Sequence, residues 1–382
     1  MIMSGYYQIP ERTNILLIED SESDAALIRA HLSHSSSKPE VHHEEYLADG
    51  IDWLKQNDID IVLLDLNLPD SDGINTFDEL HQEAPTAPVV ILAGQANEEV
   101  AIKAISHGAQ DYLSKTKVDA DSISRSIRYA IERSRRQHAE RELTIAAEIQ
   151  MGLLPQTTPN LHGFEVAGRC DPAEWAGGDY FDFFHTSDEQ ALWIVVGDVC
   201  GHGMGAALFM ADMRAVIRTL AYTLPDADLG EIFSRANRLL QSDLHSGGFV
   251  SAFLARLDVN KKEMSYATAG HPGYRLSADG TVEVLSIDDD TPVGVDHNHL
   301  YSSKASVLNS GDVFTIFTDG IWESHKTIDE PFGIQRSCEV LLKHRDKTPQ
   351  WMIDELFKAS DAFRGDTPRE DDMTAIVLKV TT

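Results

Sequence analysis

Short apolar runs recur along the first third of the chain, and helix-like segments separate them. The runs are Ile15–Ile18, Ile61–Leu64, Val89–Leu92 and the weaker Tyr112–Leu113, with segments such as Asp24–Leu32 and Glu98–His107 between them. Strands that are apolar on both faces are typical of a parallel sheet with helices on each side. The alternation therefore predicts a doubly wound α/β domain whose functional site lies at the carboxyl ends of its strands.

A long helical segment follows, from about Asp121 to Leu154. Its first part carries Ile123, Ile127 and Ile131 at four-residue spacing, and its middle, from Glu132 to Glu142, is almost wholly polar. Apolar residues return at the same spacing, and a proline ends the helix; these residues are Ile145, Ile149, Leu153 and Pro155. A polar middle between two apolar stripes cannot be buried in one core, so this helix is expected to connect two bodies.

The second half has a different pattern, with clustered strands and a few helices. The expected strands are Phe164–Cys170, Ala191–Val199, Val250–Leu257, Met264–Ala269, Val313–Thr318 and Thr374–Val380. The best helix candidates are Met204–Leu220 and Leu229–Leu244. This order predicts an α+β fold built on a β-sandwich. We therefore expect a first domain over 12–120, a helical linker over 121–158 and a second domain over 159–382.

Composition narrows the classes of function. The formal net charge of −30 disfavours binding to nucleic acid, and the one arginine-rich stretch, Arg125–Arg141, is interleaved with glutamates like a solvated helix face. No apolar run reaches the length of about 20 residues that spans a bilayer. The 3 cysteines are scattered, which fits neither a disulfide framework nor a zinc site. We expect a cytoplasmic protein that binds neither membranes nor nucleic acids.

Carboxylates stand at the ends of two of the first-domain strands. Glu19 and Asp20 follow the first run, and Asp65 follows the second. Strand ends of a parallel sheet face one crevice, where three carboxylates form a pocket suited to Mg²⁺ and one of them can attack a phosphoryl donor. Lys115, after the last strand, is placed to pair with the resulting phosphate. Each acid alone could be a strand-end cap, but the set at this spacing favours a site.

These residues resemble the receiver family of two-component systems, through "ILLIEDSESD", "IVLLDLNLPDSDG", "PVVILAG" and "GAQDYLSK". The resemblance implies a flavodoxin-like fold in which Asp65 is the phospho-acceptor. It also implies that Glu19 and Asp20 bind the metal, that Asn67 adds its backbone carbonyl, and that Lys115 and Tyr112 are the phosphate-binding lysine and the switch aromatic. Ala93 departs from the Thr or Ser usual in the family, which puts the usual switch in doubt.

Aspartates beside glycines recur in the second half, in "GGDYFDFF", "VVGDVCGHGMG", "FTDGI" and "REDDMTAIV". Asp198 and Asp319 follow apolar strands, whereas Asp371 and Asp372 precede one, so antiparallel pairing would bring them, with Asp179, to one sheet edge. Clustered carboxylates repel one another unless cations bind between them. Two Mg²⁺ or Mn²⁺ ions there would activate water and hold a phosphate. A single Asp-Gly is more often a turn, but the set points to a metal site.

This pattern resembles the metal-dependent PPM-type protein phosphatases, in the bacterial branch of sporulation and sigma-factor regulation. The likeness runs from about Ile145 to Val380, through "AAEIQMGLLP", "GGDYFDF", "GDVCGHGMGAAL", "ATAGHP", "DGIWE" and "DDMT". It implies that Asp198 bridges two metals and Val199 lends its carbonyl. Asp179 would hold one ion, and Asp319 with Asp371 the other. Asp372 is the alternative to Asp371.

Three further residues of the second half have open roles. Arg169 is a candidate for binding the substrate phosphate, with a structural ion pair as the equal alternative. His202 and His271 are candidates for protonating the leaving serine oxygen, but their glycine neighbours favour a structural role in turns.

Together these resemblances imply a response regulator in which phosphorylation of Asp65 controls a phosphatase acting on phosphoserine or phosphothreonine in proteins. The implied partners are a sensor histidine kinase and a phosphorylated STAS-type anti-sigma-factor antagonist, with a homodimer through the linker helix also plausible. Ile145, Ile149 and Leu153 would dock on the catalytic core and carry the signal, unless the helix is a passive spacer. The rival hypothesis is a catalytically silent adaptor that binds a sigma factor or its antagonist.

Overall fold

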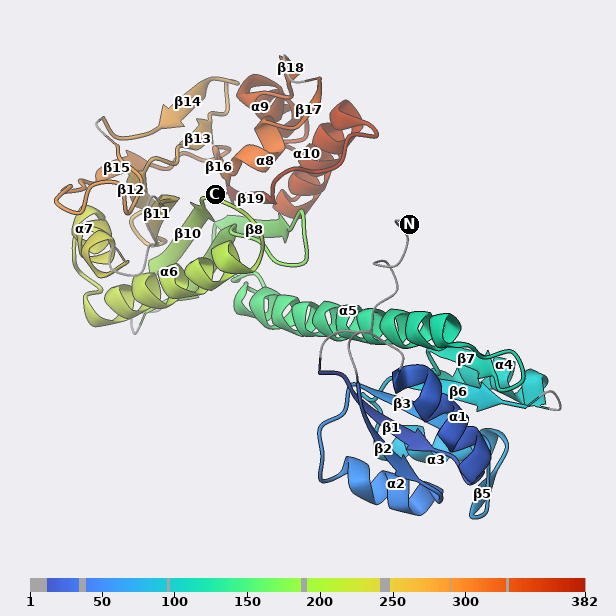
Figure 1. Cartoon of the computed structure of the whole chain (residues 1–382). Helices are drawn as coiled ribbons and strands as arrows, with labels where there is room; N and C mark the ends of the chain where they lie inside the picture. The colour runs from blue at the N-terminus through green and yellow to red at the C-terminus, as the bar shows by residue number, and fades with distance from the viewer. Residues whose placement is uncertain are drawn as a thin grey trace, which may run out of the picture. The chain divides into compact units, whose positions relative to one another are not determined.

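The computed structural model describes residues 12–33, 39–94, 97–186, 191–240, 248–288, 290–327 and 330–381 (Figure 1). The chain forms two compact units, Met1–Glu142 and Leu143–Thr382. The boundary lies within the 34-residue helix α5 (Ala120–Leu153). Within these ranges, no helix combines the length and the apolar character needed to cross a bilayer.

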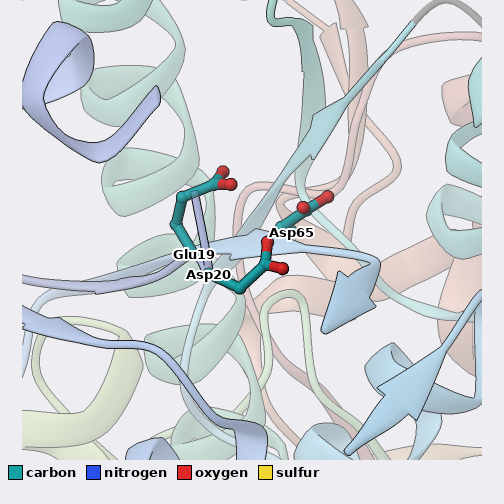
Figure 2. A group of neighbouring side chains, drawn as sticks. All are labelled: Glu19, Asp20 and Asp65. Carbon is teal, nitrogen blue, oxygen red and sulfur yellow. The ribbon is translucent and has the colours of Figure 1, made fainter. Parts of the chain in front are cut away.

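The first unit is built on a parallel sheet with the strand order β2-β1-β3-β6-β7. Its strands are β1 (Asn14–Ile18), β2 (Glu40–Glu44), β3 (Ile61–Asp65), β6 (Val89–Ala93) and β7 (Asp111–Ser114). The ends of β1 and β3 carry the acidic side chains drawn in Figure 2. This is the doubly wound sheet that the alternating pattern predicts.

Helices cover both faces of this sheet because successive strand residues point to opposite sides. In β1, Ile15 and Leu17 pack in one cluster with α1 (Glu22–Ser33) and the first part of α5. Leu16 and Ile18 pack in the other cluster. The helices on that second side are α2 (Leu47–Leu54), α3 (Ile74–Glu83) and α4 (Glu98–His107), and the short strands β4 (Asn67–Leu68) and β5 (Ser71–Asp72) pair between β3 and α3.

The second unit contains two five-stranded antiparallel sheets. In order across the first sheet, the strands are β15 (Lys304–Val307), β12 (Glu263–Ala269), β11 (Val250–Asp258), β10 (Ala191–Val199) and β9 (Tyr180–His185). In the second sheet they are β14 (Val282–Leu285), β13 (Gly273–Leu276), β16 (Val313–Phe317), β19 (Met373–Val380) and β8 (Phe164–Asp171). A separate short hairpin pairs β17 (His325–Thr327) with β18 (Glu330–Pro331).

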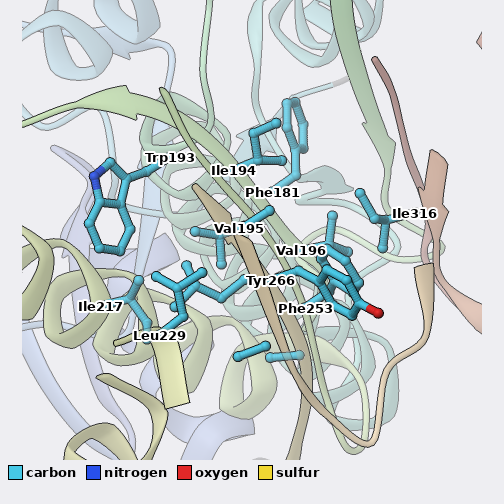
Figure 3. Close-up of a cluster of buried hydrophobic side chains, with 14 of the residues drawn as sticks. Phe181, Trp193, Ile194, Val195, Val196, Ile217, Leu229, Phe253, Tyr266 and Ile316 are labelled. Carbon is cyan, nitrogen blue, oxygen red and sulfur yellow. The ribbon is translucent and has the colours of Figure 1, made fainter. Parts of the chain in front are cut away.

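These sheets form the predicted sandwich, and alternation along β19 shows why. Ile376 and Leu378 join the core that includes the first sheet, whereas Ala375 and Val377 join a second core on the other side. Figure 3 shows the first core, where Ile316 of β16 lies with side chains of β9–β12 and of the helices α6 (Gly203–Thr223) and α7 (Leu229–Leu240). The second core includes α8 (Asp319–Trp322), α9 (Ile334–Lys343) and α10 (Pro349–Arg364).

The end of α5 packs on the second unit through a different face from the one expected. Ile145 and Ile149 are 56% and 66% exposed, whereas Gln150 is 7% exposed and Leu154 5% exposed. Leu153, the third residue of the expected stripe, is partly buried against the core. Consecutive helix residues lie about 100° apart around the axis. The face of α5 that is buried at Gln150 is therefore displaced by one residue from the expected face, which contains Ile149. Apolar spacing alone could not reveal this, since the buried face includes an amide side chain.

Candidate functional sites

The acids of the first unit converge at the carboxyl edge of its sheet. Glu19 and Asp20 follow β1, and Asp65 ends β3. One carboxylate oxygen from each lies within 4.8 Å of the others (Figure 2). Glu19 and Asp65 are buried and Asp20 is exposed, so the cluster opens to solvent on one side. Three hard oxygen donors in this arrangement fit a magnesium ion with water on its open side.

Lys115 enters the same cluster from the loop after β7. Its Nζ lies 2.5 Å from Glu19 Oε2, 2.9 Å from Asp65 Oδ2 and 3.4 Å from Asp24 Oδ2. Burial raises the pKa of Glu19 to about 7 even though Lys115 opposes this rise. Burial lowers the pKa of Lys115, but hydrogen bonds to Glu19 and Asp65 outweigh it and the net shift is upward. The ammonium group therefore stays charged within reach of the Asp65 oxygen.

Asn67, Tyr112 and Ala93 are the other receiver residues that the family resemblance singles out, and the structure places each of them in or beside a strand. Asn67 begins β4, two residues beyond Asp65. Tyr112 lies in β7 and packs against one of the two cores of this unit. Ala93 is fully buried at the end of β6, and its carbonyl accepts a hydrogen bond from the Lys115 N–H at 2.9 Å. The position for which the family resemblance implies a Thr or Ser hydroxyl therefore carries only a buried methyl group.

In the second unit, strand pairing brings the five aspartates to one end of the sandwich. Asp198 lies near the end of β10, next to the start of β9, which Asp179 precedes. Asp319 directly follows Thr318 at the end of β16. The Thr318 N–H donates to the Thr374 carbonyl at 3.0 Å, which joins the end of β16 to the start of β19 beside Asp371 and Asp372. Residues remote in sequence are thereby assembled at one place.

Mutual repulsion and burial perturb these acids strongly. Burial, followed by the charges of Asp319 and Asp371, raises the pKa of Asp198 to about 7. Burial likewise raises the pKa of Asp371 to about 6 and raises that of Asp319 with help from Glu323. The largest influences on Asp198 and Asp319 include no lysine or arginine. A divalent cation would supply the missing positive charge, so the donor set fits metal binding.

Asp179 and Asp372 are held by hydrogen bonds from the protein itself. Asp179 is 3% exposed, and its Oδ2 accepts a hydrogen bond from the Thr318 hydroxyl at 2.7 Å. Both oxygens of Asp372 accept backbone N–H groups, from Ala173 at 2.8 Å and from Asp179 at 3.3 Å. In the described part of the chain, only the receiver acids bring three carboxylate oxygens within 4.8 Å of one another. Asp371 accepts the Asp372 N–H at 2.8 Å, and the charges of both residues raise the pKa of Asp198, so the choice between Asp371 and Asp372 as a metal ligand stays open.

Glycines bring the loop before β9 close to these acids. A Cβ on Gly177 would lie 1.9 Å from Asp372 Oδ2, and a Cβ on Gly178 would lie 2.6 Å from the carbonyl oxygen of Val199. Heavy atoms cannot approach this closely, so a side chain at either position would displace the loop. The glycine pair therefore accounts for the packing of Asp372 and of the Val199 carbonyl beside the acids.

Sequence reasoning missed Gln150, a polar residue that is buried near the end of α5. Its Oε1 accepts the Gly177 N–H at 3.2 Å, and its Nε2 donates to the Gly177 carbonyl. One amide side chain thus satisfies both backbone groups of a residue two positions from Asp179. The signal in the sequence was weak, because a glutamine in a polar helix is ordinarily exposed.

Other polar residues of the second unit are engaged in structural contacts. Asp182 is fully buried and accepts two hydrogen bonds from Arg218, at 2.6 and 2.7 Å, so it belongs to the core and not to the acidic cluster. The Arg169 guanidinium hydrogen-bonds Asp171 at 2.9 and 2.6 Å and Asp354 at 3.1 Å. Phosphate binding by Arg169 therefore stays a prediction.

The two histidines considered as proton donors have different surroundings. His202 is exposed and lies 3.3 Å from Glu174. His271 is 5% exposed, and its Nδ1 lies 2.8 Å from the Ser251 hydroxyl. Burial lowers the pKa of His271 to about 4, so its ring is neutral at physiological pH. His271 lines a cavity of about 210 Å³ that Asp198 and Asp319 also line.

Comparison with known proteins matches both halves. The stage II sporulation protein E (SpoIIE) family model matches residues 188–381, and the response regulator receiver domain model matches residues 15–128. Phosphoserine phosphatase RsbU of Bacillus subtilis is 27% identical over 250 residues, covering 64% of this chain and 71% of RsbU. The cell cycle response regulator CtrA of Brucella ovis is 35% identical over 130 residues, covering 34% of this chain and 54% of CtrA.

Among solved structures, the SiaA-PP2C domain of Pseudomonas aeruginosa is similar to this chain with a TM-score of 0.57 and 21% identity. The match covers 64% of this chain and 98% of that domain, and it supports the fold of the second unit. The predicted receiver and PPM-type domains are both confirmed. The chain belongs to the SpoIIE family, with a response regulator receiver domain followed by a PPM-type serine/threonine phosphatase domain.

Proposed function

We propose that this chain removes phosphate from phosphoserine or phosphothreonine of a protein, under the control of Asp65 phosphorylation. The observation that carries the hydrolytic part is the cluster of Asp198, Asp319 and Asp371, whose pKa values rise through burial and mutual repulsion. Such a cluster is costly to keep ionised unless it holds cations. The similarity to RsbU, a phosphoserine phosphatase, supports the choice of substrate class.

The phosphatase unit would hold two Mn²⁺ or Mg²⁺ ions. The residues that would hold them are Asp179, Asp198, Asp319 and Asp371, together with the Val199 carbonyl. When bound, the ions would activate water for attack on phosphorus and neutralise the phosphate charge. Thr318 would keep Asp179 oriented through its hydroxyl, and Asp372 would hold the loop through two backbone N–H groups.

In the receiver unit, Asp65 would accept a phosphoryl group from a sensor histidine kinase. Glu19 and Asp20, with the Asn67 carbonyl, would hold the Mg²⁺ that this transfer uses. Lys115 already contacts Asp65 and would pair with the new phosphate. Because Ala93 lacks a hydroxyl, the signal would depend more on Lys115 than on the loop after β6.

Gln150 offers a route from α5 to the phosphatase loop. Its two hydrogen bonds to Gly177 exist only while the end of α5 is docked. We propose that phosphorylation of Asp65 changes how often the helix is docked, so that the loop carrying Asp179 forms or loosens. A shift of a few kcal/mol between two states would be sufficient.

The proposed protein substrate is a phosphorylated anti-sigma-factor antagonist of the STAS type, as the family resemblance implies. A homodimer through the linker is also proposed, because Ile145 and Ile149 leave an exposed apolar stripe on α5. Burying such a stripe against a second copy would be favourable.

One assay tests the proposal. The purified chain with Mn²⁺ should release phosphate from a phosphorylated STAS-domain protein, and acetyl phosphate should change the rate. An Asp65→Asn variant should keep the basal rate and lose the response. Absence of Mn²⁺-dependent turnover on phosphoproteins and on p-nitrophenyl phosphate would favour the silent-adaptor alternative.

A further inference from the structure

A cleft in the receiver unit lies away from its acidic cluster. It has a volume of about 460 Å³. It lies between the loop before β6, the end of α4 and the part of α5 from Arg133 to Arg141. This volume falls in the range of small-molecule sites. Its polar lining includes His81, His107, Gln110, Arg133, His138 and Arg141.

The cleft concentrates positive charge in a chain whose formal net charge is −30. Within the described residues, neither Arg133 nor Arg141 has a carboxylate within 4.0 Å, although most arginines of the structure have one. Arg133 does donate to the Gln110 carbonyl at 3.0 Å, which orients its guanidinium at the cleft. Two arginines without acidic partners, in a strongly acidic protein, are a ready site for an anion.

The spacing of the arginines sets the size of that anion. Arg133, Gln137 and Arg141 follow one another at four-residue intervals and so lie along one face of α5. Eight residues of helix separate the two arginines by roughly 12 Å along the axis. Because Arg133 is held at the Gln110 carbonyl, a single phosphate ion would contact both arginines only if the Arg141 side chain turned back along the helix. A ligand with several linked phosphates, or with phosphates at one end and a polar group at the other, matches the distance.

A buried amide oxygen indicates what else the ligand would offer. Gln110 Oε1 is buried and has no hydrogen-bond partner, and its Nε2 lies 3.5 Å from Gln137 Oε1. A buried acceptor without a donor is destabilising, so a ligand N–H at this place would be favourable. The ring of His81 lies nearby, stacked on Phe77 with centroids 5.3 Å apart. A heterocyclic base carries such N–H groups, whereas inorganic polyphosphate does not.

We propose that this cleft binds a nucleoside polyphosphate, with its phosphates on Arg133 and Arg141 and its base at Gln110 and Gln137. The site is separate from Asp65 and from the phosphatase acids, and the proposal does not depend on the proposed function. Its residues all belong to the first unit, and Arg141 is one residue from the unit boundary.

Isothermal titration calorimetry of the full chain, in metal-free buffer, tests the proposal with ATP, GTP, tripolyphosphate and adenosine as probes. Removing divalent ions prevents the nucleotides from binding through either acidic cluster. At least one nucleotide should bind with one-site saturation, and tripolyphosphate should bind at least fivefold more weakly. The Arg133→Gln/Arg141→Gln variant should weaken nucleotide binding at least tenfold.

The matched control is Arg135→Gln/Arg136→Gln, which removes the same charge from the same helix. Arg135 and Arg136 pair with Asp60 and Glu140 and do not line the cleft. This variant should change nucleotide affinity less than twofold. The single variant Arg141→Gln, at an exposed position, covers the case in which the double variant fails to fold. Equal losses in the two double variants, tripolyphosphate binding as tight as ATP, or no saturable binding of either nucleotide would overturn the proposal.

Discussion

The carboxylates of the receiver unit face a lysine, whereas those of the phosphatase unit face mainly one another. Lys115 contacts Glu19 and Asp65 directly. Asp198 is instead raised in pKa by burial and by further aspartates. The receiver cluster thus carries its own counter-charge, whereas no lysine or arginine is among the largest influences on Asp198 and Asp319. This difference agrees with the proposal that the first site receives a transient phosphoryl group and the second holds metal ions.

The largest effect should follow removal of the central phosphatase acid. Asp198→Ala should lower phosphatase activity by a factor of at least about 10³, because the proposed bridging ligand is lost. Phosphate release from a phosphoprotein, with Mn²⁺ present, measures this. The exposed Asp226→Ala provides the control and should retain near-normal activity. Substantial turnover by the Asp198 variant would place catalysis elsewhere.

Removing the positive charge of Lys115 should destabilise the receiver unit. Lys115→Met leaves Glu19 and Asp65 close together without their counter-charge, and breaking such a partly buried pair costs roughly 2–4 kcal/mol. Urea unfolding followed by receiver-specific probes measures the change in the free energy of unfolding. Lys55→Met, at a lysine paired with Glu83 on the surface, should have little effect. A neutral outcome for Lys115→Met would contradict the claimed role of the lysine.

His271 should give the phosphatase unit an acid-sensitive contribution to stability. Burial lowers its pKa from 6.5 to about 4, so the unfolded chain binds a proton at higher pH than the folded chain does. This contribution to the free energy of unfolding is complete above pH 6.5 and falls as the pH drops towards 4, by roughly 3 kcal/mol in all.

The pH dependence can be isolated by subtraction. The stability difference between wild type and His271→Gln, measured by urea unfolding from pH 7.5 to 4, should shift in favour of the variant as the pH falls. A difference that is constant with pH would show that His271 is not a buried neutral histidine.

Loss of the Gln150 amide should have the smallest effect of the four. Gln150→Ala removes two hydrogen bonds to Gly177 and should lower stability by about 1–2 kcal/mol and activity several-fold, through weaker metal binding. Activity as a function of Mn²⁺ concentration measures the shift. Gln156→Ala, at an exposed glutamine near the same helix end, is the control. Equal metal dependence in both variants would argue against coupling through Gln150.

Much of the fold follows from the sequence because its strands are unusually apolar. The apolar runs at Ile15–Ile18 and Val313–Thr318 are expected to be buried. The structure places β1 and β16 there. The strand β2, "EVHHE", was not predicted, because an edge strand need not be apolar. The strand β9, "YFDFFH", was not predicted either, because the buried Asp182 interrupts its apolar residues.

The candidate sites could be predicted as sets of acids but not as arrangements. Glycine-flanked aspartates identify Asp198 and Asp319, because strand ends and tight turns constrain both. Nothing in the sequence separates Asp182, which pairs with Arg218 in the core, from Asp179 in the same motif. Nor does it show that Asp372 faces backbone N–H groups. Such differences depend on contacts between residues far apart in the chain.

Thermal unfolding of the phosphatase unit within the full chain, with and without Mn²⁺, tests the dependence on cations most directly. Without metal, Asp198→Asn should melt at a higher temperature than wild type at pH 8, because one repelling charge is gone. Mn²⁺ should raise the melting temperature of wild type by several degrees more than that of the variant. A variant that melts lower without metal, or that responds to Mn²⁺ as wild type does, would contradict a cation-dependent cluster.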